Sequence, residues 1–501
     1  MADANQLSGA EVAADTSARA RDDAGPIDRV PRASPSTGGS TPTPRLRRRR
    51  IAGALLRSLI AVLVGSLILR LAGHAMGQMT QSYLDHISRH YYHISYTTRG
   101  YVIASFFITE LLGSLVLGAM SDRYGRKVFI LLGPVLGAIA VQMTAMTSVL
   151  WVLVFARLLA GLSTGSSVPA TLSYITEATV GRPSLRARVM GMFEITLVGG
   201  IAMGAVVGGY LWEFLGSSRT VMGIELLSPA FSIDALIFMF ALSIFAWGVR
   251  DKRRKTSLNS NVTSHMEAAR RKLAHYYEVF KSPAVWKFSP AWISIFSIVG
   301  VWTNHSVGLF TGKGRFQGQL LVGSISTVKF GNGFATLATF FAVGILAWSF
   351  VLARYRKTSV MIVSTFALFA LLLTVLTLNH LDSFSSPFYY LMLGLLLIEL
   401  LVLSGFMPAA LTYLADVTEN YAADRGSIMG LYSVFLGIGQ LIGTSVGGYF
   451  VDWNGVDGLL LLSAILGGIT AVSLLTLRRH ETVAASQETV AAGQETVAAD
   501  D

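Results

Sequence analysis

The stretch PATLSYITEATVGRPSLRARVMGMFEITLVGGIAMGAVVGGY, residues 169–210, occurs in related form a second time in the chain. A gapless shift of 239 positions places it on residues 408–449. The paired residues are Pro169 with Pro408, Tyr174 with Tyr413, Glu177 with Asp416, Arg186 with Arg425, Met190 with Met429, and Gly191, Gly200, Gly204, Gly208 and Gly209 with Gly430, Gly439, Gly443, Gly447 and Gly448. Shared hydrophobicity alone does not align glycines and charges. We therefore interpret the chain as two duplicated halves.

The composition places these halves in a membrane. The chain has 501 residues, of which 52% are hydrophobic and only 14% charged, whereas soluble proteins carry about 25% charged residues. One membrane-spanning helix needs roughly 20 apolar residues. Twelve such segments lie near residues 52–83, 99–120, 127–147, 149–177, 188–214, 229–249, 288–312, 330–353, 358–380, 387–415, 427–451 and 457–477. The sequence thus predicts an all-α membrane protein with twelve transmembrane helices in two six-helix pseudo-symmetric bundles, at 51–249 and 288–477.

Polar segments flank and separate the two bundles. Residues 1–50 have the composition of a disordered tail, and its arginine cluster at 45–50 is expected to contact anionic lipids rather than nucleic acid. Residues 250–287 form a basic linker with an expected amphipathic helix near 267–281. Residues 478–501 contain three seven-residue repeats; a solvated low-complexity tail is favoured over a weak helix.

Basic residues set the expected orientation. When the basic residues at the edges of the apolar segments are included, connections after even-numbered helices and the C-terminal tail hold 22 Lys and Arg, and connections after odd-numbered helices hold six. Because cytoplasmic loops are enriched in positive charge, we expect a multi-pass protein of the plasma or inner membrane with the linker and both termini in the cytoplasm.

The second and third helices are joined by an ordered motif, G-x-x-x-D-R-x-G-R-K, made by Gly118, Asp122, Arg123, Gly125, Arg126 and Lys127. At this position the motif resembles the major facilitator superfamily of secondary transporters. The corresponding segment 352–357 in the second half lacks the acid and the glycine. The resemblance implies a gating network on the cytoplasmic side, composed of the motif residues with Glu177, Arg186, Asp416 and Arg425.

Helices 4 and 5 add two further similarities. Arg157 lies in a pattern similar to the family's second motif, and residues 200–209 resemble the glycine motif of the family's antiporters, with Ala205 in place of proline. That replacement weakens the case for efflux. The six glycines Gly200, Gly204, Gly208, Gly439, Gly443 and Gly447 predict faces where helices approach closely.

Polar residues inside the apolar segments are the candidate transport site, since lipid does not accommodate them. Ser66, Arg70, His74 and Gln78 follow one face of the first helix. The expected substrate cavity comprises Arg70, His74, Gln78, Arg157, Asn304 and His305, with a plain helix–helix hydrogen bond as the equal alternative for His305. Glu110 and Glu399 are the expected proton carriers, because a carboxylate can take up a proton and lose its charge. Glu194 and Asp234 are expected to be structural.

Several chemistries have no support in the sequence. Without cysteine there is no disulfide or thiolate site, and neither a Walker loop nor an H-E-x-x-H motif is present. The G-x-S-x-G pattern at 161–165 lies in an apolar helix and not after a strand. We therefore expect no enzyme activity, no cofactor and no metal.

These observations predict a secondary active transporter that moves a small organic solute, with an anion preferred because of the arginines, by proton-coupled symport. The alternative is a multidrug/proton antiporter, and a transporter-like receptor or a membrane enzyme is a remote one. Substrate identity, direction, coupling ion and oligomeric state stay open.

The charge distribution gives the first testable prediction. The basic loops place the C-terminal tail in the cytoplasm. A reporter that functions in the cytoplasm should therefore be active when it is fused after Arg478, and a reporter that functions only outside the cytoplasm should be inactive. Parallel fusions with alkaline phosphatase and a fluorescent protein measure this. Activity of the phosphatase fusion alone would contradict it.

Overall fold

The computed structural model describes residues 44–221, 224–250, 283–312, 316, 318–417 and 425–500. The amphipathic helix expected at 267–281 lies outside these residues. The chain divides into two units, Met1–Ile51 and Ala52–Asp501, and the packing below belongs to the second.

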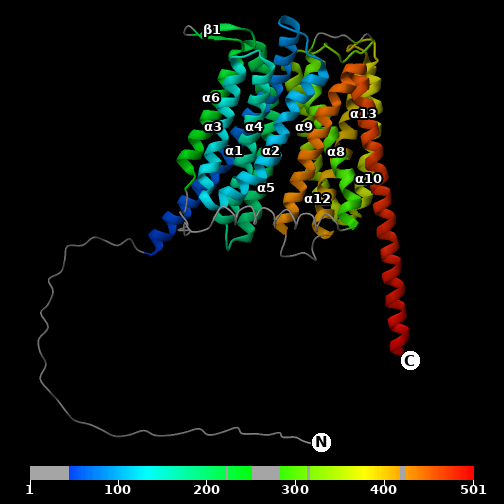
Figure 1. Ribbon diagram of the computed structural model, residues 1–501. Helices are drawn as coiled ribbons and strands as arrows, with labels where there is room; N and C mark the ends of the chain where they lie inside the picture. Colours follow the sequence, from blue (N-terminus) through cyan, green and yellow to red (C-terminus); the bar gives the residue numbers. More distant parts are fainter. Residues whose placement is uncertain are drawn as a thin grey trace, which may run out of the picture. The chain divides into compact units, whose positions relative to one another are not determined.

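Long helices make up nearly all of the described chain (Figure 1). The first half contains α1 (Pro44–His90), α2 (Tyr96–Tyr124), α3 (Arg126–Ala145), α4 (Leu150–Ala178), α5 (Pro183–Leu215) and α6 (Pro229–Gly248). The second half contains α8 (Pro283–Thr311), α9 (Thr327–Val351), the short 3₁₀ helix η1 (Leu352–Arg354), α10 (Lys357–Asn379), α11 (Pro387–Leu403), α12 (Phe406–Val417) and α13 (Arg425–Asp500).

Eleven helical segments in the described residues are long and apolar enough to cross a membrane. One of them, Val434–Thr482, belongs to α13 and is really two helices, because Asn454 and Gly455 leave the helical conformation there. Gly455 has a φ of 57°, which glycine adopts without strain. With this segment counted as two, the predicted twelve-helix architecture is confirmed.

A small hairpin departs from the all-helical prediction. Strands β1 (Arg219–Val221) and β2 (Ile224–Leu226) pair antiparallel between α5 and α6, with Arg219 opposite Leu226. These residues fall between two apolar segments, so hydropathy carried no signal for them. The hairpin lies outside the helices and leaves their arrangement unchanged (Figure 1).

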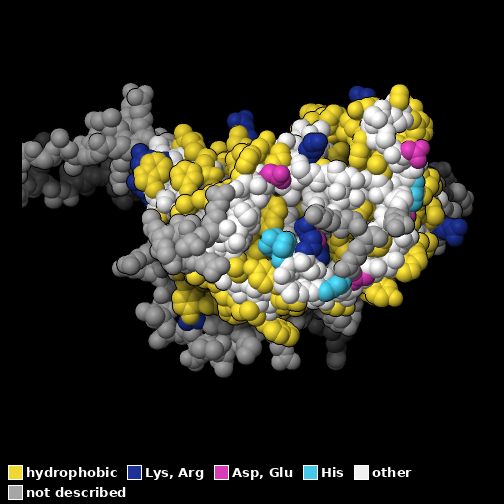
Figure 2. Space-filling view, turned by 90° about the horizontal axis from the view of Figure 1, so that it is seen from above, with side chains coloured by type: hydrophobic (Ala, Val, Ile, Leu, Met, Phe, Trp, Pro, Cys, Tyr) yellow, Lys and Arg dark blue, Asp and Glu magenta, His cyan; other side chains and the backbone are white. Residues whose placement is uncertain are grey.

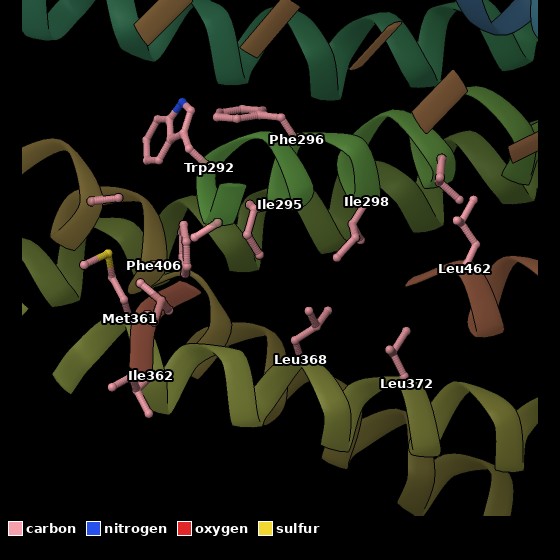
Figure 3. Packing of buried hydrophobic residues seen from close by; sticks show 14 of the residues in the cluster. Trp292, Ile295, Phe296, Ile298, Met361, Ile362, Leu368, Leu372, Phe406 and Leu462 are labelled. Carbon is pink, nitrogen blue, oxygen red and sulfur yellow. The ribbon is translucent and has the colours of Figure 1, made fainter. Parts of the chain in front are cut away.

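Each half has a packed interior and an apolar outside. In the first half α4 packs on α2 and α3, and α3 packs on α6. In the second half α8, α10, α12 and α13 enclose a core that includes Trp292, Phe296, Met361 and Phe406 (Figure 3). Large apolar side chains that remain exposed, such as Phe240 and Phe366, suit contact with lipid.

Glycines bring matching helices together in the two halves. A methyl group added to Gly204 of α5 would lie 2.6 Å from the Leu71 carbonyl oxygen and 2.7 Å from Cβ of His74, both on α1. One added to Gly443 of α13 would collide with the backbone of Ser297 on α8. The other four predicted packing glycines behave alike: Gly200 and Gly208 face α1, and Gly439 and Gly447 face α8. The sequence repeat therefore corresponds to one packing arrangement used twice.

The two halves meet through α2 against α13 and α5 against α9. Hydrogen bonds between the halves lie at the end where α1 and α5 finish and α2 and α9 begin. Gln81 donates to the Thr303 carbonyl oxygen at 3.1 Å, Thr97 donates to Asp452, and Thr327 donates to Glu213. We call this the joined end. Figure 2 shows the molecule from this end, with a few charged and histidine side chains among backbone and other side chains, and hydrophobic side chains around them.

Two segments at the ends of the chain differ from their sequence-based description. Helix α1 begins at Pro44 and so includes the arginine run at 45–50. The backbone of α13 is helical through Asp500. For the repeats at 481–501 the structure therefore has the helix, and not the low-complexity tail that the composition favoured. Disorder was expected for residues 1–50, but residues 44–50 are helical, and residues 1–43 lie outside the described residues. The role of both tails stays a prediction.

The glycine contacts give the second prediction. Gly204→Leu and Gly443→Leu should lower the folded yield, because each places a side chain into the backbone of the neighbouring helix, and overpacking costs about 1–3 kcal/mol. Gly394→Leu is the matched control, since nothing lies within 4 Å of a methyl group added there. Monodisperse yield after size-exclusion chromatography measures the effect; equal yields for all three variants would show that the close contacts do not matter.

Candidate functional site

Arg70 is the centre of a cluster of charged side chains in the first half. It lies on α1, half-buried, and its guanidinium Cζ is 5.0 Å from the centroid of the Phe193 ring on α5. Such a stack places a cation over the electron-rich face of the ring. The charges of Glu194 on α5 and Glu110 on α2 both act on Arg70.

Arg157 joins the same cluster from α4. Its side chain is 5% exposed, and its Cζ lies 5.2 Å from the centroid of the Phe106 ring on α2. Glu110 acts on Arg157 as well as on Arg70. Helices α2 and α4 are held close here, because Gly161 and Gly165 of α4 pack against the backbone near Glu110. One carboxyl group on α2 thus interacts electrostatically with guanidinium groups on two other helices.

None of these four charged groups forms an ion pair within 4.0 Å with another among the described residues. Nε of Arg157 has no hydrogen-bond partner in the part of the chain that the structure describes. His74 lies one turn after Arg70 on α1 and is exposed. The positive charge of Arg70 disfavours a second positive charge on His74. The cluster therefore has donors that a bound anion can use. No group of three His, Asp or Glu that could hold a metal ion occurs in the described ranges.

The other residues expected in the substrate cavity lie elsewhere. His305 is 2% exposed, and its Nε2 lies 2.8 Å from the Thr444 carbonyl oxygen on α13. Asn304 donates to Thr444 Oγ1 at 3.0 Å. Both side chains thus join α8 to α13, which is the helix–helix alternative for His305. Gln78 is buried beside Gly209 of α5, near the joined end.

The two expected proton carriers are separated. Glu110 belongs to the cluster, whereas Glu399 on α11 is 8% exposed and accepts a hydrogen bond of 3.0 Å from Thr374 on α10. Its second carboxyl oxygen, Oε2, has no partner among the described residues. Glu399 therefore lies in the second half, away from the arginines.

The expected gating residues lie at the end opposite the joined end. Arg126 pairs with Glu177 at 3.0 Å and also donates to Ser121, while Arg186 donates to Thr179 and to the Thr176 carbonyl oxygen. Asp416 pairs with Lys357 at 2.9 Å. Each of these contacts lies within one half. Gly118 packs against Pro169, and Gly125 has a φ of 101° at the turn between α2 and α3; the side chains of Asp122 and Arg425 lie outside the described residues.

Sequence reasoning missed part of this arrangement. Spacing along single helices did not show that Glu194 on α5 interacts electrostatically with Arg70 on α1, and the structural role expected for Glu194 stays a prediction. The aromatic rings under the two arginines carried no signal in spacing either. Asp234 on α6 is fully buried and neither carboxyl oxygen has a hydrogen-bond partner among the described residues. A separate groove of about 500 Å³ between α8 and α13, lined by Trp286, Lys287 and Ile469 among others, contains none of the cluster residues.

The shared carboxylate gives the third prediction. Glu110→Gln should lower the free energy of unfolding by about 1–3 kcal/mol, because it removes the negative charge that Arg70 and Arg157 share. Adding Arg157→Gln should recover stability instead of reducing it further. Thermal unfolding of the purified single and double variants tests this coupling as a double-mutant cycle; purely additive effects would mean that the two groups do not interact.

Comparisons with known proteins agree with this architecture. Multidrug resistance protein 1 of Bacillus subtilis (strain 168) is 26% identical over 367 residues, which are 72% of this chain and 82% of that protein. The arabinose-proton symporter of the same organism is 30% identical over 111 residues, 22% of this chain and 24% of that protein. The crystal structure of the nucleoside transporter NupG superposes with a TM-score of 0.60 at 16% identity, covering 83% of this chain and 98% of that chain, which shows a common fold.

The family match extends over both halves. A sequence model of the Major Facilitator Superfamily matches residues 51–328 and 320–498, so the two matches together extend over both halves. Twelve membrane helices, two packed halves and a charged cluster between helices are consistent with solute transport. The chain belongs to the Major Facilitator Superfamily of membrane transporters.

Proposed function

We propose that this transporter carries a small organic anion together with a proton. The observation that carries the proposal is a pair of arginines within the helix bundle, Arg70 over the Phe193 ring and Arg157 over the Phe106 ring. Both interact electrostatically with Glu110, and no ion pair joins the three groups. Arginine binds carboxylates and phosphates through several donors in a fixed plane. The free Nε of Arg157 and the exposed His74 supply further positions for an anionic group.

The same cluster supplies a coupling mechanism. While Glu110 is ionised, it offsets part of the charge of the two arginines. When Glu110 takes up a proton, the arginines lose this counter-charge and attract an anion more strongly. Proton and anion then bind cooperatively, and the coupling is reciprocal. The name of the arabinose-proton symporter among the relatives supports proton coupling in this family branch.

A second candidate is multidrug/proton antiport. It is favoured by the relative named Multidrug resistance protein 1, which matches 72% of this chain. In that case the arginines would tune Glu110 as a proton carrier, and apolar or cationic compounds would bind elsewhere. Glu399 is a candidate second proton site under either function, because one of its oxygens is unpartnered among the described residues.

The orientation and the inner gate belong to this proposal. With both termini cytoplasmic, the joined end faces away from the cytoplasm and the ion pairs of Arg126 and Asp416 lie on the cytoplasmic side. These pairs lie within single halves while the joined end is closed. We expect them, with Asp122 and Arg425, to exchange partners across the halves when the cytoplasmic side closes. The arginines at 45–50 would contact anionic lipid on that side.

The substrate class is tested by Arg70→Gln. This variant should weaken binding of the transported anion about tenfold or more, because charge-assisted hydrogen bonds contribute about 1.5–3 kcal/mol, and it should remain folded. A thermal-shift screen of wild-type protein against metabolites and drugs identifies the ligand, and binding is then measured across pH. Flux into proteoliposomes driven only by an imposed proton gradient tests the coupling.

The matched control is Arg57→Gln, which removes an arginine from the same helix, where Arg57 lies over Trp247. Antiport predicts that Arg70→Gln shifts the pH dependence and spares neutral or cationic compounds. Unchanged affinity of Arg70→Gln for an identified anion would end the anion proposal.

A further inference from the structure

The duplication extends past the aligned stretch to two acids at the joined end. The shift of 239 positions that pairs Tyr210 with Tyr449 also pairs Glu213 with Asp452. Glu213 lies near the end of α5, and Asp452 lies just before the kink of α13. The structure uses both acids in the same way, as contacts from one half to the first turn of a helix in the other half.

Asp452 holds the beginning of α2. Its Oδ1 accepts from the Tyr96 backbone N–H at 2.8 Å. Its Oδ2 accepts from the Thr97 backbone N–H and from Thr97 Oγ1, both at 2.7 Å. The N-cap residue Ser95 occupies a further N–H of the same turn, that of Thr98. A carboxylate from the second half thereby completes the first turn of a helix of the first half.

Glu213 holds the beginning of α9. Its Oε2 accepts from Thr327 Oγ1 at 2.7 Å, and Thr327 is the first residue of that helix. Ser326 caps this turn by accepting from the Lys329 N–H, as Ser95 does on α2. Here a carboxylate from the first half reaches a helix of the second half.

Matching glycines admit the two helix ends. A methyl group on Gly209, one turn before Glu213, would lie 2.6 Å from the Thr327 carbonyl oxygen. A methyl group on Gly448, one turn before Asp452, would lie 2.8 Å from Cα of Thr97. Gly209 and Gly448 are themselves a pair in the repeat. Each contact thus consists of a glycine, an acid one turn later and a Ser-capped helix start.

We infer that Glu213 and Asp452 are paired latches that keep the joined end of the transporter closed. Each carboxylate accepts hydrogen bonds at the positive end of a helix macrodipole. Because the carboxylate and the helix belong to different halves, these hydrogen bonds exist only while the halves touch. Both acids are exposed, so water replaces the lost hydrogen bonds when the halves separate. Such contacts bias a conformational equilibrium without fixing it. The inference rests on transport by alternating access and is independent of the substrate.

The chain's lack of cysteine allows a single-cysteine test. Gly77→Cys provides the reporter, because nothing lies within 4 Å of an added methyl group there and residue 77 lies on the same face of α1 as Arg70, seven residues on. Whole cells are treated with a membrane-impermeant maleimide, and the rate of labelling measures how often the joined end opens. The parent Gly77→Cys should react slowly from outside and faster in inverted membrane vesicles.

Asp452→Ala and Glu213→Ala, each added to the reporter, should raise the labelling rate from outside about tenfold, which corresponds to about 1.4 kcal/mol in the opening equilibrium. The double variant should label faster than either. Asp382→Ala is the matched control, an exposed acid that follows α10 at the same end, and it should leave the rate unchanged. Elution of every variant as a monodisperse peak excludes unfolding as the cause.

Three outcomes would overturn part of the proposal in distinguishable ways. Unchanged labelling in the double variant would show that the acids do not hold the joined end closed. A rise with only one acid removed would leave a single latch and end the pairing. A parent reporter that labels fast from outside and slowly in inverted vesicles would refute the orientation proposed above, while the latches would then be tested from the other side.

Discussion

Close approach of helix backbones at glycines is the constraint on which this structure depends. Inside a bilayer, helices gain little from hiding apolar surface from each other, so packing and small residues hold them together. Helix α5 meets α1 through Gly200, Gly204 and Gly208, and it meets α9 through Gly209. One helix therefore links its own half and the opposite half through adjacent glycines, and α13 does the same with α8 and α2. A larger side chain at any of these positions would collide with the helix that the glycine faces.

The scaffold is symmetric, but its charges are not. The repeat retains the packing glycines and the acids of the joined end. It does not retain the charged cluster, because Glu194 corresponds to Ser433. When the same shift is continued towards the N-terminus, Arg157 corresponds to Leu396. Leu396 is 9% exposed and belongs to the apolar core of the second half. Duplication thus accounts for the two similar halves, and the charged cluster described above belongs to the first of them. The proposed site therefore lies on α1, α2, α4 and α5.

The sequence predicted the fold far better than the site. Twelve spans and two halves could be predicted because lipid permits few backbone structures and because Gly204 and Gly443 occupy equivalent positions in the repeat. The hairpin at 219–226 was not predicted, because it lies between two apolar segments and hydropathy gives no sign of strands there. Spacing along one helix placed Arg70 and His74 on a common face, yet it could not show that Glu194 faces Arg70 from another helix, or that His305 bonds to Thr444. The equivalence of Glu213 and Asp452 could have been predicted from the sequence, since continuing the repeat by three residues aligns them.

The energetics of the joined end suit a protein that must open and close there. Each hydrogen bond between the halves contributes about 0.5–1.5 kcal/mol net, with those to carboxylates at the upper end. Because Glu213 and Asp452 are reached by water, opening exchanges these bonds for hydration instead of leaving buried groups unpaired. The halves also pack through α2 against α13 and α5 against α9. A ligand shifts such an equilibrium only by its differential affinity for the two states, and exchangeable contacts at this end keep the required difference to a few kcal/mol.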